Sequence, residues 1–231
     1  MHLAPLFRKF WFPILGLSFF TGSSLAENLS APLPPSQTSE SATDDLALES
    51  TLPVVAMGNP KAPLKIVMFH SLNCSHCKDF KVNVLPKIKT QFIDQDLIYF
   101  QFIDFPTDRS SLDAAKIAWG ARDMEIYKKA SHLLTENYER WAGQPDWQKE
   151  LCQIVIEKQL MTEKECIKSL ADEALGEEIL RISFEAQKKH KIDYAPAFLF
   201  NGKLKQTTEP LSFDDIKAEL KTILDNQPKA D

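Results

Sequence analysis

Short apolar runs alternate with longer segments in which apolar residues recur at helical spacing. Residues 64–72 (LKIVMFHSL) and 97–105 (LIYFQFIDF) are mostly apolar runs of strand length, and Pro106 closes the second. Between them, apolar side chains recur every fourth residue, at Phe80, Val84, Ile88 and Phe92. This spacing predicts a helix over about 74–92, which Pro86 should kink. Strand, helix and strand in this order indicate a parallel pair joined by a crossover.

A helical pattern then extends from about Ser110 to Lys191. Gly120 and the segment 143–145 (GQP) interrupt it, and Thr162 with Glu165 forms the T-x-x-E pattern of a helix capping box. We therefore expect several helices inserted at about 107–190.

The C-terminal part predicts a hairpin and a last helix. Residues 197–200 (AFLF) and 203–205 are separated by Asn201-Gly202, a strong signal for a two-residue hairpin turn. A further amphipathic segment begins near Ser212. The predicted fold class is therefore α/β, with a mixed sheet that ends in an antiparallel edge and carries a helical insertion.

The N-terminal 26 residues have the pattern of a secretory signal peptide. Arg8 and Lys9 precede an apolar run at 10–20, and small residues then lead to an expected cut after Ala26. Eleven residues of helix span only about 16 Å, half of the ~30 Å hydrocarbon core. An uncleaved anchor is the alternative.

Residues 27–50 are rich in Ser, Pro, Thr and Ala and lack an apolar period, so we expect a flexible linker. The domain expected after it covers 51–231.

Composition excludes two broad classes. The chain has 231 residues, of which 44% are hydrophobic, enough for a substantial core, and its formal net charge is −5. The hydrophobic content excludes global disorder, and the acidic balance argues against a sequence-independent nucleic-acid binder. Export would place the four cysteines in an oxidising compartment, where disulfides persist.

The segment Cys74-Ser75-His76-Cys77 carries the most informative chemistry. It lies where a predicted strand passes into a predicted helix, and the start of a helix favours an anion. A thiolate there has a pKa lowered from ~8.5 into the range of about 3.5–7.5. Only the thiolate attacks a disulfide, and Cys77 is close enough to form a small disulfide ring with Cys74. His76 adds a positive neighbour, so this spacing suits disulfide exchange.

Other interpretations of the motif are a zinc site, a haem attachment and a purely structural disulfide. A zinc site would need a second close pair of ligands, whereas Cys152 and Cys166 are fourteen residues apart; His70 is a possible third ligand. Haem attachment requires His where Lys78 stands. A disulfide ring this small would constrain the unfolded chain little.

Cys152 and Cys166 lie on either side of an expected turn near residues 160–162. Two antiparallel helices would bring them together, and in an oxidising compartment we expect a structural disulfide. Two separately buried thiols are the alternative.

From Gly58 to Leu220, roughly seven-tenths of the chain, the sequence resembles the DsbA-like thioredoxin-fold thiol:disulfide oxidoreductases, in their single-chain exported branch. The matching segments are 58–63 (GNPKAP), 74–77 (CSHC), 85–86 (LP), 195–198 (APAF) and 201–203 (NGK), with Phe102, Asp104, Phe105 and Pro106 in the second strand.

The resemblance implies a nucleophilic Cys74, a resolving Cys77 and a cis bond at Ala195-Pro196 that faces them and helps to bind substrate. On residue statistics alone, Pro196 could equally be an ordinary proline at the start of a strand. Three positions depart from the family pattern. Met68 stands where a buried acid is usual, Ser75 where oxidases commonly carry Pro, and Ala195 where Thr or Val is usual. His76 or solvent would then serve the proton route.

These features predict an exported enzyme that introduces disulfides into newly secreted proteins, and the resemblance implies a bacterial periplasm as the setting. The resemblance implies reduced, unfolded exported proteins as substrates and a membrane quinone-linked partner that reoxidises the enzyme. We expect a monomer with no cofactor and no nucleic-acid partner. The alternatives are an isomerase or reductase of the same fold, and an exported copper chaperone that uses the same two thiols.

Overall fold

The computed structural model describes residues 51–205 and 210–226. The expected signal peptide at 1–26 and linker at 27–50 lie outside the described residues. None of the helices within these two ranges has the length and apolar content needed to cross a bilayer.

Five strands form one mixed sheet in the order β1-β3-β2-β4-β5. They are β1 (Val55–Met57), β2 (Leu64–His70), β3 (Ile98–Asp104), β4 (Ala197–Phe200) and β5 (Lys203–Leu204). Strands β2 and β3 are parallel, whereas β1 with β3, β2 with β4 and β4 with β5 are antiparallel. The predicted parallel pair and antiparallel edge are therefore confirmed, and β1 is a short strand that the pattern did not indicate.

The turn between β4 and β5 shows why the hairpin prediction succeeds. Asn201 and Gly202 both adopt positive φ, at 46° and 80°. Asn and Gly are the residues that tolerate positive φ best. A turn with this backbone fits the twist of the two strands that it joins. The Asn201 side chain also accepts a hydrogen bond from the N–H of Lys65 and donates one to the carbonyl of Pro63, so the hairpin is tied to β2.

The helical segments, in chain order, are α1 (Ser75–Asp79), the π-helical turn η2 (Phe80–Val84), α2 (Leu85–Ile88), the π-helical turn η3 (Lys89–Ile93), α3 (Arg109–Ala118), α4 (Met124–Glu136), α5 (Tyr138–Trp141), α6 (Trp147–Glu157), α7 (Glu163–Ala171), α8 (Glu173–His190) and α9 (Phe213–Asp225).

The first helix runs from α1 to η3 without a gap, close to its predicted bounds. Pro86 has no N–H to donate, so a regular α-helical ladder cannot continue through it. The N–H of Leu85 bonds instead to the carbonyl of Phe80, five residues earlier. The predicted disturbance at Pro86 therefore takes the form of a π-helical turn just before the proline.

The helical insertion is divided as predicted at Gly120, at 143–145 and at 158–162, and also at Asn137 and Asp172. Thr162 and Glu165 form the predicted capping box at the start of α7. The breaks at Asn137 and Asp172 carry no Gly or Pro, which explains why the sequence pattern did not place them.

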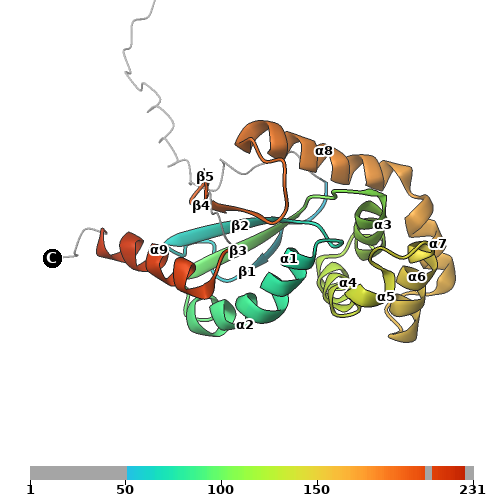
Figure 1. Cartoon of the computed structure of the whole chain (residues 1–231), viewed down its shortest axis with the longest axis horizontal. Helices are drawn as coiled ribbons and strands as arrows, with labels where there is room; N and C mark the ends of the chain where they lie inside the picture. The colour runs from blue at the N-terminus through green and yellow to red at the C-terminus, as the bar shows by residue number, and fades with distance from the viewer. Residues whose placement is uncertain (1–50, 206–209, 227–231) are drawn as a thin grey trace, which may run out of the picture. The chain divides into compact units, whose positions relative to one another are not determined.

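Helices cover both faces of the sheet (Figure 1). On one face, alternate residues of β2 such as Ile66 and Met68 pack against Phe80 and Ile88 of the first helix and against α9. On the other face, the intervening residues, such as Phe69, pack against the C-terminal end of α8. Helix α8, the last helix of the expected insertion, thus packs directly on one face of the sheet. Helices α3 to α7 form the rest of the insertion.

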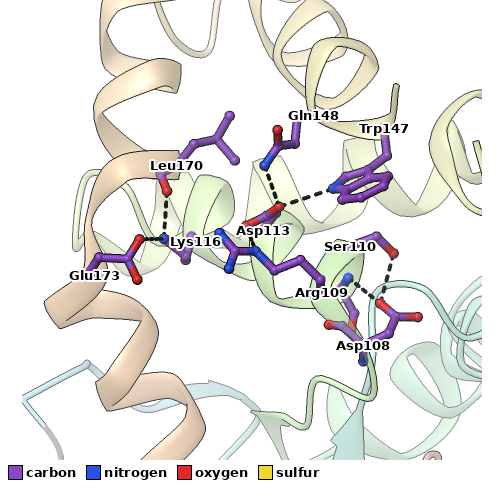
Figure 2. Close-up of polar contacts among 10 residues, drawn as sticks. Asp108, Arg109, Ser110, Asp113, Lys116, Trp147, Gln148, Leu170 and Glu173 are labelled. Atoms are coloured by element: carbon purple, nitrogen blue, oxygen red, sulfur yellow. Dashed lines mark hydrogen bonds and ion pairs between the residues drawn. The ribbon is translucent and has the colours of Figure 1, made fainter. Parts of the chain in front are cut away.

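Helix α3 holds the insertion together through two buried polar side chains (Figure 2). The carboxylate of Asp113 accepts hydrogen bonds from Arg109 at 3.1 Å, Trp147 at 3.1 Å and Gln148 at 2.8 Å. On another side of α3, the Nζ of Lys116 donates to the carbonyl of Leu170 at 2.6 Å. These contacts fix α3 against α6 and α7.

Candidate active site

Cys74 caps the N-terminus of α1. Its backbone is extended (φ −117°, ψ 115°), and its sulfur accepts a hydrogen bond from the N–H of Cys77 at 3.2 Å. The sulfur therefore occupies the position that a Ser or Asp oxygen takes in ordinary helix caps. The free N–H groups and the dipole of a helix start stabilise negative charge. The local fold thus places Cys74 where its thiolate is favoured.

Cys77 lies one turn further along, in the core between the first helix and the sheet. It is 1% exposed, whereas Cys74 is partly exposed, and both are free thiols. One sulfur is consequently open to a reaction partner while the other is shielded beside it.

The two thiols have opposite pKa shifts. The hydrogen bond from the Cys77 side chain is the largest of the effects that lower the pKa of Cys74 to about 6. Backbone N–H groups of Cys77 and His76 and the charge of His76 act in the same direction, and burial opposes them. Burial raises the pKa of Cys77 far above its usual range, and its hydrogen bond to Cys74 adds to the shift. At neutral pH the geometry therefore supports a Cys74 thiolate that accepts a hydrogen bond from a Cys77 thiol.

The segment before β4 brings Ala195 and Pro196 to the same place. The Ala195–Pro196 peptide bond is cis, and the carbonyl oxygen of Ala195 lies 3.4 Å from the Cys74 sulfur. Both residues are partly exposed beside the partly exposed sulfur. Of the sequence-predicted site residues, the structure thus brings together Cys74, Cys77, His76 and the Ala195–Pro196 pair.

The loop that leads into Cys74 is anchored to the insertion. The side-chain amide of Asn73 donates to Asp108 at 2.7 Å and to Ser110 at 2.8 Å. Asp108 is itself the N-cap of α3 and, as Figure 2 shows, also contacts Ser110. The residue just before the candidate nucleophile is therefore held by the first helix of the insertion.

The residues near the cysteines differ widely in their exposure. Phe69 and Leu72, which precede the cysteine motif, are 0% and 4% exposed and belong to the core. Apolar strand residues next to an active-site loop are more easily buried than exposed, because both faces of this sheet are covered. Tyr194, just before the cis bond, is 45% exposed instead. His70, the possible third zinc ligand, is fully buried and contacts Lys81 and Tyr127 in a polar cluster.

That cluster contains residues that the sequence analysis missed. His70 ends β2 and Asp104 ends β3, and they are partners in the parallel register. Lys81 and Tyr127 complete the group with His70. The available signals were weak: Lys81 follows Cys77 by four residues, and His70 and Asp104 interrupt otherwise apolar strands.

The second cysteine pair lies away from these residues, in the insertion. A disulfide joins Cys152 of α6 to Cys166 of α7, with a Cα–Cα distance of 5.7 Å. These sulfurs are therefore bonded to each other and do not complete a zinc site with Cys74 and Cys77. Within residues 51–205 and 210–226, no three His, Cys, Asp or Glu side chains gather as metal ligands would.

The comparisons with known proteins agree with this geometry. A family model described as thioredoxin matches residues 50–222. A probable disulfide bond formation protein D of Bacillus anthracis is 30% identical over 170 residues, which cover 70% of this chain and 74% of the relative. A putative protein-disulfide oxidoreductase of Rickettsia prowazekii is 25% identical over 177 residues and 76% of this chain.

The chain spans 63% of the length of that Rickettsia protein, so the two are not equivalent over their full lengths. Among solved structures, α-DsbA1 of Wolbachia pipientis has the same fold. It superposes with a TM-score of 0.65 at 24% identity, over 78% of this chain and 95% of the other.

The family match covers the sheet, both cysteine pairs and the cis-proline segment. The CXXC motif opens the first helix, and the helical insertion follows the parallel strand pair. The chain therefore belongs to the thioredoxin family, in its DsbA-like branch.

Proposed function

We propose that this protein is an exported thiol:disulfide oxidoreductase that introduces disulfides into other proteins by exchange at Cys74 and Cys77. The observation that carries the proposal is the asymmetry of the two thiols. The partly exposed Cys74 has a pKa lowered to about 6, and the buried Cys77 has a raised pKa and donates to it. Dithiol–disulfide exchange needs one accessible thiolate and one shielded partner.

In the first step, a substrate thiolate attacks the Cys74 sulfur of the Cys74–Cys77 disulfide. The bond between the two cysteines breaks, Cys77 leaves with the electron pair, and a mixed disulfide joins Cys74 to the substrate. In the second step, another substrate thiolate attacks the substrate sulfur of that mixed disulfide. Cys74 departs as a thiolate, which its low pKa favours, and the substrate gains a disulfide.

Neighbouring groups would orient and tune these steps. The Ala195 carbonyl and the adjacent Pro196 lie beside the attacked sulfur, where an extended substrate segment could pair with the backbone. His76 is exposed, and its charge helps to lower the pKa of Cys74. We assign substrate contact to Ala195 and Pro196 and thiolate stabilisation to His76.

The size of the Cys74 shift bears on the direction of the reaction. With a pKa of about 6, the Cys74 thiol is mostly ionised at pH 7. Ionisation of this kind stabilises the reduced form about tenfold, or about 30 mV for a two-electron couple. A typical reductant at about −270 mV and a strong oxidant at about −120 mV differ by far more. Other contacts of the two sulfurs must therefore supply most of any oxidising power.

The proposed setting is a bacterial periplasm. The N-terminal pattern supports export, and the Cys152–Cys166 disulfide suits an oxidising compartment. The name of the Bacillus anthracis relative refers to disulfide bond formation. The substrates would be reduced, unfolded exported proteins, and a membrane quinone-linked partner would restore the Cys74–Cys77 disulfide of the monomeric enzyme.

The decisive experiment is the reduction potential of the Cys74–Cys77 pair in glutathione buffers. A potential near about −120 mV is expected for an oxidase. A potential near about −270 mV would identify a reductant and overturn the oxidase assignment in favour of a reductase or isomerase. A variant with both Cys74 and Cys77 replaced by Ser reports any signal from Cys152–Cys166 alone and serves as the baseline.

A further inference from the structure

A polar cluster lies where β2 and β3 end, beside the helix that carries the cysteine motif. It draws on four elements: His70 from β2, Asp104 from β3, Lys81 from η2 and Tyr127 from α4. His70, Asp104 and Tyr127 are 0%, 9% and 2% exposed, and Lys81 is partly buried. Grouping of ionisable side chains inside an apolar core is costly unless the groups are mutually paired. The cluster therefore calls for a role beyond packing.

The hydrogen bonds define where the protons of the cluster lie. The Nζ of Lys81 is 3.0 Å from the Nδ1 of His70, so a charged Lys81 donates to a neutral imidazole. The Nε2 of His70 then carries the proton and faces the hydroxyl of Tyr127 at 3.3 Å. Tyr127 donates to the Oδ1 of Asp104 at 2.9 Å. One placement of the protons therefore satisfies all of these hydrogen bonds, and it puts the positive charge on Lys81.

The other oxygen of Asp104 is also occupied. The indole N–H of Trp119 donates to its Oδ2 at 2.8 Å. Asp104 is thus held as an acceptor. It lies at one end of the hydrogen-bonded series, and Lys81 lies at the other end. This fixed carboxylate orients His70 and Tyr127, and through them it positions the Lys81 ammonium.

Lys81 is the member of the cluster that lies on the same continuous helix as the two reactive thiols. It follows Cys77 by four residues, and residues so spaced lie on the same helix face with Cβ atoms about 5–6 Å apart. The backbone N–H of Ser71, the neighbour of His70, faces the Cys77 sulfur. The charges of Cys77 and Cys74 both act on Lys81 and favour its protonated form. Met68, on the same face of β2, is apolar and 0% exposed, so it offers no proton.

A cavity connects this cluster with the surface. Its volume is about 260 Å³, large enough for several waters, and the buried residues His70 and Tyr127 line it together with Lys81. Lys128 and His132 of α4 line it as well, and the His132 side chain is 72% exposed. A proton on Lys81 therefore has a path to solvent that does not pass the substrate side of Cys74.

We propose that Lys81 exchanges the proton of Cys77 during the redox cycle, with His70, Asp104 and Tyr127 as its positioning residues. The proposal rests on the oxidoreductase function proposed above. When a substrate thiolate opens the disulfide, Cys77 leaves as a thiolate and takes a proton from the Lys81 ammonium, directly or through one water. When Cys77 later attacks a mixed disulfide at Cys74, neutral Lys81 removes that proton. The thiolate then forms the new sulfur–sulfur bond, and the bound thiol departs with the electron pair.

The charges around Lys81 suit this exchange. The groups that face it are Cys74, Cys77, His70, Asp104, Tyr127 and Ser131, with Lys128 and His132 along the cavity. Burial lowers the pKa of Lys81 to about 8, while the negative charge of Asp104 opposes the shift. Burial also keeps the pKa of His70 well below its usual range, and Lys81 adds to this effect. Lys81 is thus the group in the cluster that can gain and lose a proton near neutral pH.

The test separates attack by Cys74 on a disulfide reagent from attack by Cys77 on the mixed disulfide that results. Reduced protein mixed with dithiobis(nitrobenzoate) releases one coloured thiolate when Cys74 attacks and a second when Cys77 resolves the mixed disulfide. In Lys81→Met, we expect the first phase to be within about twofold of the unmodified protein. The second phase at about pH 7 should slow by roughly tenfold or more, the scale of general acid–base catalysis.

Lys81→Arg distinguishes proton exchange from charge alone. Arginine keeps a positive charge but does not give up its proton near neutral pH, and the adjoining cavity offers space for its larger side chain. We expect the second phase to remain slow in this variant. Lys128→Met, at the same cavity but paired with Glu125, is the matched control and should leave both phases unchanged.

Asp104→Asn provides a test that keeps Lys81. Loss of the carboxylate charge lowers the pKa of Lys81, so the pH midpoint of the second phase should move to lower pH. Any one of three results would overturn the proposal. The second phase is unchanged in Lys81→Met, it recovers in Lys81→Arg, or its pH midpoint stays the same in Asp104→Asn. Both phases are read independently of the reduction potential, so failure of the oxidase assignment is distinguishable.

Discussion

The carbonyl oxygen of Ala195 lies 3.4 Å from the sulfur of Cys74, although 121 residues separate them along the chain. On the helix side, the same sulfur accepts from the N–H of Cys77 at 3.2 Å. A carbonyl accepts from a thiol but repels a thiolate, whereas an N–H group favours the thiolate. The lowered pKa of Cys74 shows that the donors prevail. The reactive sulfur is thus held between two groups that favour opposite protonation states.

The first prediction concerns the hydrogen bond from the Cys77 side chain, the largest effect that lowers the pKa of Cys74 to about 6. Cys77→Ala removes this donor, so the pKa of Cys74 should rise by about one unit or more. Cys77→Ser keeps a donating hydroxyl and should restore most of the shift. The measurement is the pH dependence of alkylation of Cys74. If the alkylation midpoints of both variants equal that of the unmodified protein, the backbone donors alone set the pKa of Cys74.

The second prediction is that the reduced protein gains stability as pH rises. The folded pKa of Cys74 is lowered from 9.0 to about 6, so the unfolded chain binds more protons between these values. The contribution is lost as pH falls through about 6 and grows until about pH 9, where the thiol of the unfolded chain ionises as well. At pH 7 it amounts to at most about 1.4 kcal/mol, since partial exposure screens the charge. Urea unfolding of reduced protein should show this slope.

The matched control for that slope is Cys74→Ser, which has no thiol at this position and should lose the Cys74 contribution. A slope that persists in Cys74→Ser would have to come from other ionisable groups. The comparison must keep the Cys152–Cys166 disulfide intact, because its reduction would change stability independently of pH.

His76 gives the third prediction. Its backbone N–H and its charge both help to lower the pKa of Cys74, after the larger contributions of Cys77. His76→Ala keeps the N–H and removes only the charge, so the rise in the Cys74 pKa should be less than about one unit and smaller than in Cys77→Ala. The reduction potential should become slightly more negative, because the reduced form loses stabilisation. An effect as large as that of Cys77→Ala would contradict this ranking.

Much of the architecture follows from local patterns. The strands at 64–70 and 98–104, the Asn201-Gly202 hairpin and the capping box of Thr162 are each encoded within a few neighbouring residues. The three-residue strand β1 is different, because Val55–Met57 is too short to show an alternation. Its place is set by pairing with β3, which no local pattern reveals.

The same distinction applies to the site. The spacing of Cys74 and Cys77 is local, and the sequence therefore indicates the pair. The polar cluster depends on the register that sets His70 opposite Asp104, and on the packing of α4, which supplies Tyr127. Neither is visible in a single segment. His70 alone in the sequence is an isolated histidine on an apolar strand, and its place in the polar cluster becomes apparent only with Lys81 beside it.

The fourth prediction tests the Cys152–Cys166 disulfide. It joins α6 and α7 across a separation of 14 residues, for which the chain-entropy model gives about 3 kcal/mol. Replacing both cysteines by Ala should lower the free energy of unfolding by about that amount and leave the pH midpoint of Cys74 alkylation unchanged. The pair lies away from Cys74, so a shift of that midpoint would show that the insertion influences the reactive thiol.

The fifth prediction concerns Asp113, whose carboxylate is fully buried between α3 and α6. It accepts from Arg109, Trp147 and Gln148 (Figure 2). Asp113→Asn replaces one acceptor oxygen with a donating amide, which must face one of these donors. The expected cost is about 1–3 kcal/mol in the free energy of unfolding, the penalty for an unpaired buried group.

Arg109→Met is the matched control for Asp113→Asn. It removes one donor whose side chain is 59% exposed and leaves the carboxylate its partners from α6. Its cost should be clearly smaller, since water can replace the exposed guanidinium. If both substitutions cost the same, the exposed ion pair and not the buried contacts to Trp147 and Gln148 would secure α3. Because α3 also holds Asn73 through Asp108, Asp113→Asn should in addition broaden the range of Cys74 alkylation rates.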